Sequence, residues 1–204
     1  MDRKGLLMVL SGPSGAGKGT ICEYFMKKNK DVLLSVSSTT RQPREGEIPG
    51  VSYNYISKEE FEKGLSQDGF LEHVFVFDNY YGTPRDVVVE NIEKGIDVLL
   101  EIEIVGAMQI KKKFPEAVLI FVLPPSIKEL ESRIYKRGTE TVEQIKQRLG
   151  RAISEIKEIS EYSYFIINQD VDESVEYMES IIKAEKSSVK RYNSELLRFY
   201  EEEK

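Results

Sequence analysis

Apolar residues fall along this chain in short continuous runs that amphipathic segments separate. The runs have the length of buried strands, and we predict strands at 6–11, 32–36, 96–103, 117–123 and 164–168. Helical spacing and capping residues predict helices at 18–28, 84–94 and 105–113, and a charged amphipathic helical tail from 172 onward. Strands that alternate with helices indicate an α/β fold of three layers with a parallel five-stranded sheet in the middle.

Two sections interrupt this alternation. The first contains a polar loop at 37–47, a short strand at 53–56 and a strand at 70–77, with a helix that a capping box opens at Ser57. We expect a turn at 79–82, and then Thr83 as the cap and Pro84 as the first residue of the next helix.

The second section contains two more capping patterns, at Ser126 and Thr141, and is predicted as helices 126–137 and 141–160. The chain is therefore divided into a core, an inserted arm and a helical lid. The core comprises 1–36, 84–125 and 161–204, the arm 37–83, and the lid 126–160.

A glycine-rich loop joins the first strand to the first helix, and its sequence is Gly12-Pro13-Ser14-Gly15-Ala16-Gly17-Lys18-Gly19-Thr20. Glycines allow the backbone to curl with its N–H groups pointing inward, and the helix N-terminus adds partial positive charge. A strand, this loop and a helix in that order predict a phosphate-binding loop, with Lys18 reaching the β- and γ-phosphates. Because the hydroxyl comes at Thr20 and not at residue 19, two arrangements for a metal stay open: contact with Thr20, or support by phosphates and water.

The amino-acid composition excludes several classes of function for this protein. The net charge of −6 argues against a protein that coats a nucleic-acid polymer, so phosphate binding must come from local arginine and lysine clusters. Cys22 is the only cysteine, which excludes an internal disulfide and predicts a buried, apolar thiol in a reducing compartment. The only histidine, His73, is expected to be packed. The apolar runs are too short to span a bilayer, and we expect a cytoplasmic protein without a membrane partner.

Arginines gather in the two interrupting sections. Arg41 and Arg44 lie in the polar loop, while Arg133, Arg137, Arg148 and Arg151 lie on the predicted helical pair. Guanidinium groups match phosphate oxygens, so both groups are candidate anion clamps. Solvated arginines with glutamate partners are the simpler alternative. Inserted arms that close over two substrates are what a phosphoryl transferase needs.

At this point the sequence resembles the guanylate kinase family over nearly the whole chain, from Gly12 to Asn168. The glycine-rich loop, 35–47, 79–83 and 137–140 carry the resemblance, and the Ser-Thr-Arg segment within 35–47 is its most specific part. The resemblance implies transfer of the γ-phosphoryl group of ATP to GMP or dGMP, with Mg²⁺ as the cofactor.

The family pattern also implies residue roles. Glu72 would accept hydrogen bonds from guanine, and Ser37 and Thr83 would donate to its O6. The other residues of the GMP site would be Arg41, Arg44, Tyr53, Tyr81, Gly82, Glu101 and Glu103. Charge on the transferring group would be neutralised by Lys18, Arg133, Arg137 and Arg148. ATP would contact Gly12, Pro13, Ser14, Gly15, Ala16, Gly17, Lys18, Gly19, Thr20 and Asn168, and Thr20 is the candidate metal contact.

The sequence departs from the family at three places. Glu101 and Glu103 stand where Asp-x-Asp is frequent, Val105 replaces a glutamine, and Gln169 follows Asn168 where an aspartate is frequent. The extra methylene of each glutamate shifts the metal–water and guanine contacts that the family pattern implies. None of these departures removes a charge that phosphoryl transfer requires.

The sequence leaves two other functions open. The first is a non-catalytic module that uses the same fold to bind phosphopeptides, against which Lys18 and the arginines of the lid count. The second is a phosphotransferase with another nucleoside monophosphate as acceptor, against which Glu72 and Ser37 count.

Overall fold

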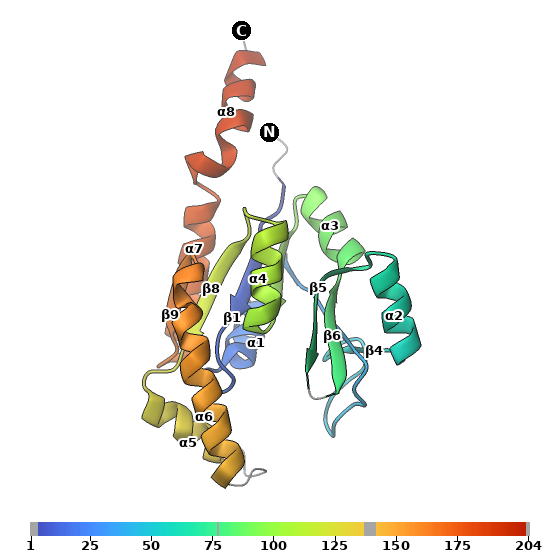
Figure 1. Ribbon diagram of the computed structural model, residues 1–204. Coiled ribbons are helices and arrows are strands. Elements are labelled where there is room, and N and C mark those ends of the chain that lie inside the picture. Colours follow the sequence, from blue (N-terminus) through green and yellow to red (C-terminus); the bar gives the residue numbers. More distant parts are fainter. Residues whose placement is uncertain (1–3, 77, 137–141, 203–204) are drawn as a thin grey trace.

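A computed structural model describes residues 4–76, 78–136 and 142–202 of the chain. Its central sheet has five strands in the order β2-β7-β1-β8-β9, and all of them run parallel. Their bounds are β1 Leu7–Ser11, β2 Val32–Leu34, β7 Asp97–Glu101, β8 Val118–Leu123 and β9 Tyr164–Ile167. The predicted parallel five-stranded sheet is therefore confirmed (Figure 1).

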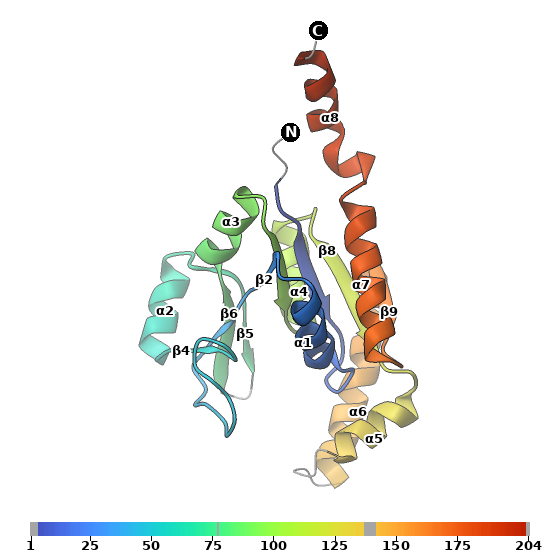
Figure 2. The ribbon, with the colours of Figure 1, turned by 180° about the vertical axis from the view of Figure 1, so that it is seen from behind.

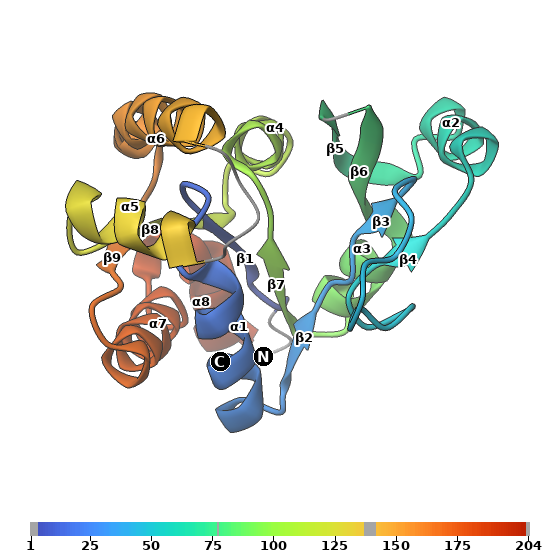
Figure 3. The same cartoon turned by 90° about the horizontal axis from the view of Figure 1, so that it is seen from below.

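Helices cover both faces of this sheet because alternate side chains of each strand point in opposite directions. Met8 and Leu10 of β1 pack with α1 (Lys18–Lys28) and α7 (Val171–Glu185). Leu7 and Val9 face the other way, toward α3 (Arg85–Glu93) and α4 (Ile104–Lys113). All five residues of β1 are buried, as expected for the middle strand of three layers seen end-on in Figure 3.

The inserted arm forms a second sheet of four strands in the order β4-β3-β6-β5, with one helix beside it. Its elements are β3 Ser38–Thr39, β4 Asn54–Tyr55, α2 Lys58–Ser66, β5 Phe70–Val76 and β6 Asn79–Pro84. Ser57 caps α2 with the predicted capping box, in which its Oγ accepts from the backbone N–H of Glu60. The stacked rings of Phe61 and Phe70, with centroids 4.2 Å apart, fasten this helix to the sheet.

The arm is attached to the core through α4, which packs against β5. The amide of Gln109 on α4 pairs with the backbone N–H and C=O of His73, and Lys113 Nζ donates to the carbonyl oxygen of Leu71 at 2.7 Å. The side chain of His73 itself is exposed. The prediction of a packed histidine is therefore wrong, because β5 turns this side chain away from the helix that its backbone contacts.

Two helices, α5 (Ile127–Lys136) and α6 (Val142–Ile156), lie in the segment predicted as a lid and lead through a short 3₁₀ turn, η1 (Lys157–Glu161), into β9. Leu130 and Ile134 of α5 pack against Ile145 and Ala152 of α6, which gives the pair a small core of its own. Figure 2 shows this pair beyond the carboxyl ends of the strands, on the far side of the sheet from the arm. Arg137 and Thr141, to which we assigned a role and a cap, lie outside the described residues.

Three local predictions are wrong. Residues 79–82 do not turn but belong to β6, and the positive φ of Asp78 (60°) marks the turn before it. Thr83 is not a helix cap, because it belongs to β6, and α3 begins two residues later at Arg85. Ser38 and Thr39 form a strand within the predicted loop, since β6 and β4 supply backbone partners on both sides.

The predicted helical tail is broken into α7 and α8 (Val189–Glu202), and Figure 1 shows α8 extending away from the sheet. Lys186 at the end of α7 forms an ion pair with the buried Asp97 at 2.6 Å. Among residues 4–76, 78–136 and 142–202, no helix combines the length and the apolar character needed to cross a membrane.

Candidate active site

The glycine-rich loop lies at the carboxyl edge of the sheet, directly after β1. Lys18 is the first residue of α1, and its Nζ folds back to donate to the carbonyl oxygens of Gly12 and Pro13, at 2.6 and 3.3 Å. Burial lowers the pKa of Lys18, while the carboxylates of Glu101, Glu103 and Glu155 oppose that shift. A cation enclosed by loop carbonyls in this way is held next to the site where a phosphate chain would bind.

The lid reaches this loop through two of its predicted arginines. Arg148 on α6 donates to the hydroxyl of Ser14 at 2.7 Å, and Arg133 on α5 lies 3.4 Å from the carbonyl oxygen of Ala16. Arg133 also pairs with Glu129 one turn earlier, so the solvated-face alternative accounts for only part of its contacts. The structure therefore brings together around the loop Lys18, Arg133 and Arg148, three residues to which the family resemblance gives a shared role.

Glu101 ends β7 opposite Leu10 of β1, so the sheet register puts its carboxylate at the loop. Its oxygens come within 3.5 and 3.7 Å of where a Cβ at residue 19 would stand, so the carboxylate lies beside the first turn of α1. Burial raises the pKa of Glu101, and the charge of Lys18 opposes the rise. Cys22 is buried beneath it as predicted, and burial raises the pKa of its thiol well above the usual range.

Glu72 is the buried carboxylate of the arm. Its Oε1 accepts a hydrogen bond from Thr83 Oγ1 at 2.7 Å, and both side chains are buried. Its Oε2 lies 2.3 Å from where a Cβ at residue 106 would stand, so the first turn of α4 passes this closely because Gly106 has no side chain. Burial raises the pKa of Glu72, whereas its bonds to Thr83 and the charge of Lys113 lower it.

Arg41 is the centre of a polar cluster in the loop between β3 and β4 of the arm. Its Nε lies 3.2 Å from the hydroxyl of Tyr81, and its two terminal nitrogens bind both carboxylate oxygens of Glu47 at 2.9 and 2.8 Å. Glu47 also accepts from the hydroxyl of Tyr55 at 2.7 Å. Arg41 lowers the pKa of Glu47 to about 2, so this carboxylate stays ionised. Tyr53 completes the cluster, with its ring 5.9 Å from that of Tyr81.

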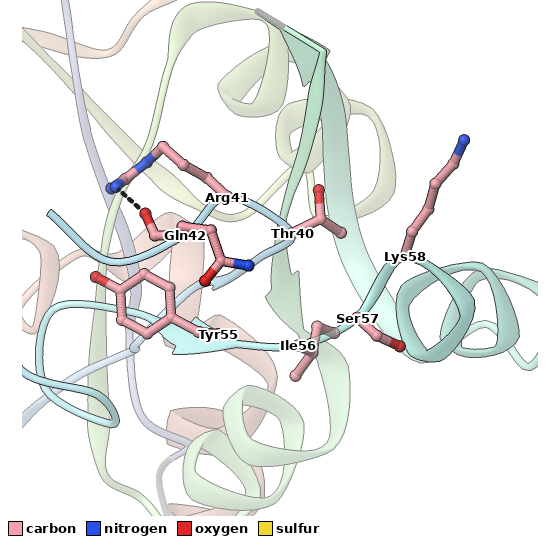
Figure 4. A pocket seen from close by; sticks show the side chains of 7 residues that line it. All are labelled: Thr40, Arg41, Gln42, Tyr55, Ile56, Ser57 and Lys58. Carbon is pink, nitrogen blue, oxygen red and sulfur yellow. Dashed lines mark hydrogen bonds between the residues drawn. The ribbon is translucent and has the colours of Figure 1, made fainter.

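Figure 4 shows the hollow beside this cluster, where the guanidinium of Arg41 is turned toward the carbonyl oxygen of Gln42. The hollow is lined by Thr40, Arg41, Gln42, Tyr55, Ile56, Ser57 and Lys58. Arg44 is exposed and Ser37 is half-buried on the neighbouring loop. Arg41, Tyr53 and Tyr81 are thus brought together as predicted, whereas the Arg44 side chain stands apart from them in the solvent.

Glu47 was given no role from the sequence, and Arg151 was expected only as a member of a candidate anion clamp. Glu47 was noted only as part of a motif, although its spacing of six residues from Arg41 permits the pair that the folded loop makes. Arg151 on α6 binds Glu103 Oε2 at 2.7 Å and Glu155 Oε1 at 2.7 Å. Glu103, predicted at the GMP site, therefore joins the lid to the first turn of α4. The pair of Arg151 and Glu103 depends on proximity in the fold, which sequence spacing does not encode.

Known proteins match the chain over nearly its whole length. A family model described as guanylate kinase matches residues 4–185. The chain belongs to the guanylate kinase family. It is 54% identical over 201 residues to the guanylate kinase of Clostridioides difficile (strain 630), covering 98% of each chain. It is 52% identical over 202 residues to that of Caldanaerobacter subterraneus subsp. tengcongensis, covering 99% of this chain and 98% of the relative.

A solved structure of the guanylate kinase family has the same fold. The crystal structure of guanylate kinase from Anaplasma phagocytophilum superimposes with a TM-score of 0.77 at 33% identity, covering 92% of this chain and 89% of the other. The family resemblance and the fold class expected from the sequence are both confirmed. The role of each site residue within the guanylate kinase family pattern stays a prediction.

Proposed function

We propose that this protein transfers the γ-phosphoryl group of ATP to GMP or dGMP, giving ADP and GDP or dGDP, and so serves purine nucleotide metabolism. The observation that carries the proposal is the buried carboxylate of Glu72, held by Thr83 on the arm that faces the phosphate loop. Guanine presents two donors on one edge, N1–H and the 2-amino group. Adenine has no 2-amino group and an unprotonated N1, so a fixed carboxylate favours guanine.

The chain's own residues perform the transfer by positioning and charge. The attacking group is a phosphate oxygen of GMP that is already ionised, so no general base is needed. Lys18, Arg133, Arg137 and Arg148 would stabilise the negative charge that spreads over the transferred group. Arg41, Arg44, Tyr53 and Tyr81 would hold the acceptor phosphate. Closure of the lid over the loop would keep water away from the reacting phosphate.

The residues at the loop fit a magnesium ion. Mg²⁺ prefers oxygen ligands and is usually held by one or two side chains together with substrate phosphates and water. The carboxylate of Glu101, adjacent to Gly19, is such an oxygen donor, and the exposed hydroxyl of Thr20 is another. The ion supplies positive charge to the phosphates when it is bound.

A coupled assay of ADP release tests the proposal. GMP, dGMP, AMP, CMP and UMP are compared as acceptors at one ATP concentration. We expect rapid ADP release with GMP and dGMP alone. ADP release without preference among the acceptors, or none with any of them, would show that the proposed reaction is wrong. A cytoplasmic location is part of the proposal, and the single buried thiol supports it.

A further inference from the structure

Asn168 follows β9 and is one of the few buried polar residues of the core. Its side-chain Nδ2 donates to the carbonyl oxygen of Ala16 in the phosphate loop at 2.8 Å. Its Oδ1 lies 3.2 Å from the hydroxyl of Ser174 on α7, whose one hydrogen is shared between this oxygen and the carbonyl oxygen of Asp170 at 2.6 Å. The amide therefore bridges α7 and the loop.

The loop backbone is shaped to accept this amide. Gly17 has a φ of 97°, and a Cβ at that position would stand 2.1 Å from Asn168 Nδ2. Both the conformation and the space therefore require glycine there. The close approach and the hydrogen bond both involve Asn168 Nδ2, and together they place the amide against the Ala16–Gly17 peptide.

A second donor reaches the same carbonyl group. Arg133 Nη1 lies 3.4 Å from the Ala16 oxygen, and Arg133 Nη2 donates to the backbone oxygen of Asn168 at 3.1 Å. The Ala16 carbonyl is thus held from outside the loop by α5 and by the segment after β9. Because a trans peptide is planar, its N–H and C=O point in opposite directions. Holding the Ala16 oxygen outward therefore directs the N–H of Gly17 inward.

We propose that Asn168 is a positioning residue of the phosphate loop, which fixes the Ala16–Gly17 peptide so that the Gly17 N–H points at the triphosphate. The inference rests on the proposed function, because it assumes that the loop binds the phosphates of ATP. It assigns Asn168 to the loop and not to the adenine base, which the family resemblance placed near this residue. The ligand affected is then any triphosphate, whatever base it carries.

The experiment compares Asn168→Asp with a matched variant, Asn29→Asp. Asn29 also donates to a backbone carbonyl, that of Phe25 at 3.1 Å, and also joins α1 to α7 through Glu179 at 2.9 Å. It lies at the opposite end of α1 from the loop. Binding of ATP and of inorganic tripolyphosphate, which has no base, is followed through the Gly17 amide resonance in a nuclear magnetic resonance titration. KM for ATP and for GMP is measured in parallel.

In Asn168→Asp a carboxylate oxygen replaces the donor and faces the Ala16 oxygen. We expect the dissociation constants for ATP and for tripolyphosphate to rise together by about tenfold, which is the size of one lost hydrogen bond beside a charged group. KM for ATP should rise with them, while KM for GMP should stay within about twofold. Asn29→Asp should leave all four values close to wild type.

Ser174→Ala is the second variant, and it decides the matter if Asn168→Asp does not fold. It removes the donor to Oδ1 and keeps the amide, so we expect the same pattern at about twofold to threefold. The proposal is wrong if the loss is confined to ATP while tripolyphosphate binds normally, since Asn168 would then contact adenine. It is also wrong if GMP and ATP are weakened equally, or if neither variant changes triphosphate binding.

Failure of the proposed function gives a different result. A wild-type protein that releases no ADP with GMP would contradict the kinase reaction, yet its tripolyphosphate titration would still test the role of Asn168. Conversely, an active wild-type kinase whose tripolyphosphate affinity does not respond to either variant contradicts only the role of Asn168.

Discussion

Thr83 donates its hydroxyl hydrogen to Glu72 across two antiparallel strands of the arm, at 2.7 Å and away from solvent. The two residues are opposite each other in the register of β5 and β6, so the sheet itself sets their separation. A buried carboxylate with a fixed partner keeps one orientation. Its second oxygen can then contact a ligand without the loss of side-chain entropy that ordering a mobile carboxylate would require.

Replacing Thr83 by Val removes this bond and keeps the shape of the side chain. We expect the free energy of unfolding to fall by about 1–3 kcal/mol, because a buried acceptor loses its partner. KM for GMP should rise, and KM for ATP should not. Chemical denaturation and steady-state kinetics measure the two effects. Thr83→Ser keeps the hydroxyl and is the control, which should stay close to wild type in both.

Glu72→Gln tests the choice of guanine. The amide NH₂ would face the donor edge of the base, so kcat/KM for GMP should fall by about 10² or more. The loss should be selective, with ATP binding measured in the absence of GMP unchanged. An unaltered kcat/KM for GMP would contradict the assigned role of this carboxylate.

The raised pKa of Glu72 predicts how GMP binding depends on pH. Burial is the cause, Glu103 adds to it, and Thr83 and Lys113 oppose it. GMP requires the ionised form, so affinity should weaken as pH falls through the raised pKa. The stability of the free protein should show the opposite trend. A carboxyl group whose pKa is raised by folding binds more protons in the folded state than in the unfolded state. Its contribution to the stability of the protein is therefore lost as pH rises.

Calorimetric titration with GMP measures the first trend and thermal unfolding measures the second, each from about pH 4 to about pH 8. Glu72→Gln is the reference, because the phosphate of GMP titrates equally in both proteins. The difference in GMP affinity between wild type and Glu72→Gln should vanish at the acidic end of the range, where Glu72 is protonated. A GMP affinity whose pH profile is the same in both would refute the prediction.

Gly106→Ala tests the close approach of α4 to the carboxylate. The added Cβ would stand 2.3 Å from Glu72 Oε2, so either the helix or the carboxylate must move. We expect KM for GMP to rise by about tenfold, with little change in KM for ATP. Gly150→Ala is the control on α6, where the new Cβ would meet no atom within 4 Å apart from its chain neighbours and the nearby backbone of its own helix. That variant should stabilise the protein by about 0.5–1 kcal/mol, since alanine favours helix over glycine.

Lys18→Ala separates chemistry from acceptor binding. The variant removes the cation held at the carbonyls of Gly12 and Pro13. We expect kcat to fall by more than about 10², because charge at the transferred group is no longer compensated. The dissociation constant for GMP, measured by calorimetry without ATP, should change by less than about twofold. A comparable loss of GMP affinity would show that the division into two nucleotide sites is wrong.

Local patterns predicted the elements that depend on neighbours in sequence. The first helix begins at Lys18 and ends at Lys28 as expected, and the capping box at Ser57 opens α2. The helix before Gly95 also ends where a glycine with positive φ follows it. In each case the caps and turn residues lie within four positions of the backbone groups that they satisfy. Short-range interactions of this kind can be predicted from a single sequence.

Predictions failed where a distant partner competed with a local one. Thr83 and Pro84 have the sequence context of a helix start, but β5 pairs with both of them, so α3 begins only at Arg85. Residues 79–82 have the composition of a turn, yet β5 offers a full set of backbone partners. The tail has helical periodicity throughout, and its break before α8 follows no pattern that we recognised in the sequence.

The amino-acid order alone determined the alternation of strands and helices, the phosphate loop with Lys18, and the family, because these depend on spacing along the chain. Only the folded molecule decided that Glu47 engages Arg41, that Arg151 of the lid grips Glu103, and that the Asn168 amide supports the Ala16 carbonyl. The first contact lies within one loop of the arm, whereas the other two join residues that parallel strands and their crossovers bring to one edge of the sheet. Their geometry follows from how the layers pack, which no local pattern specifies.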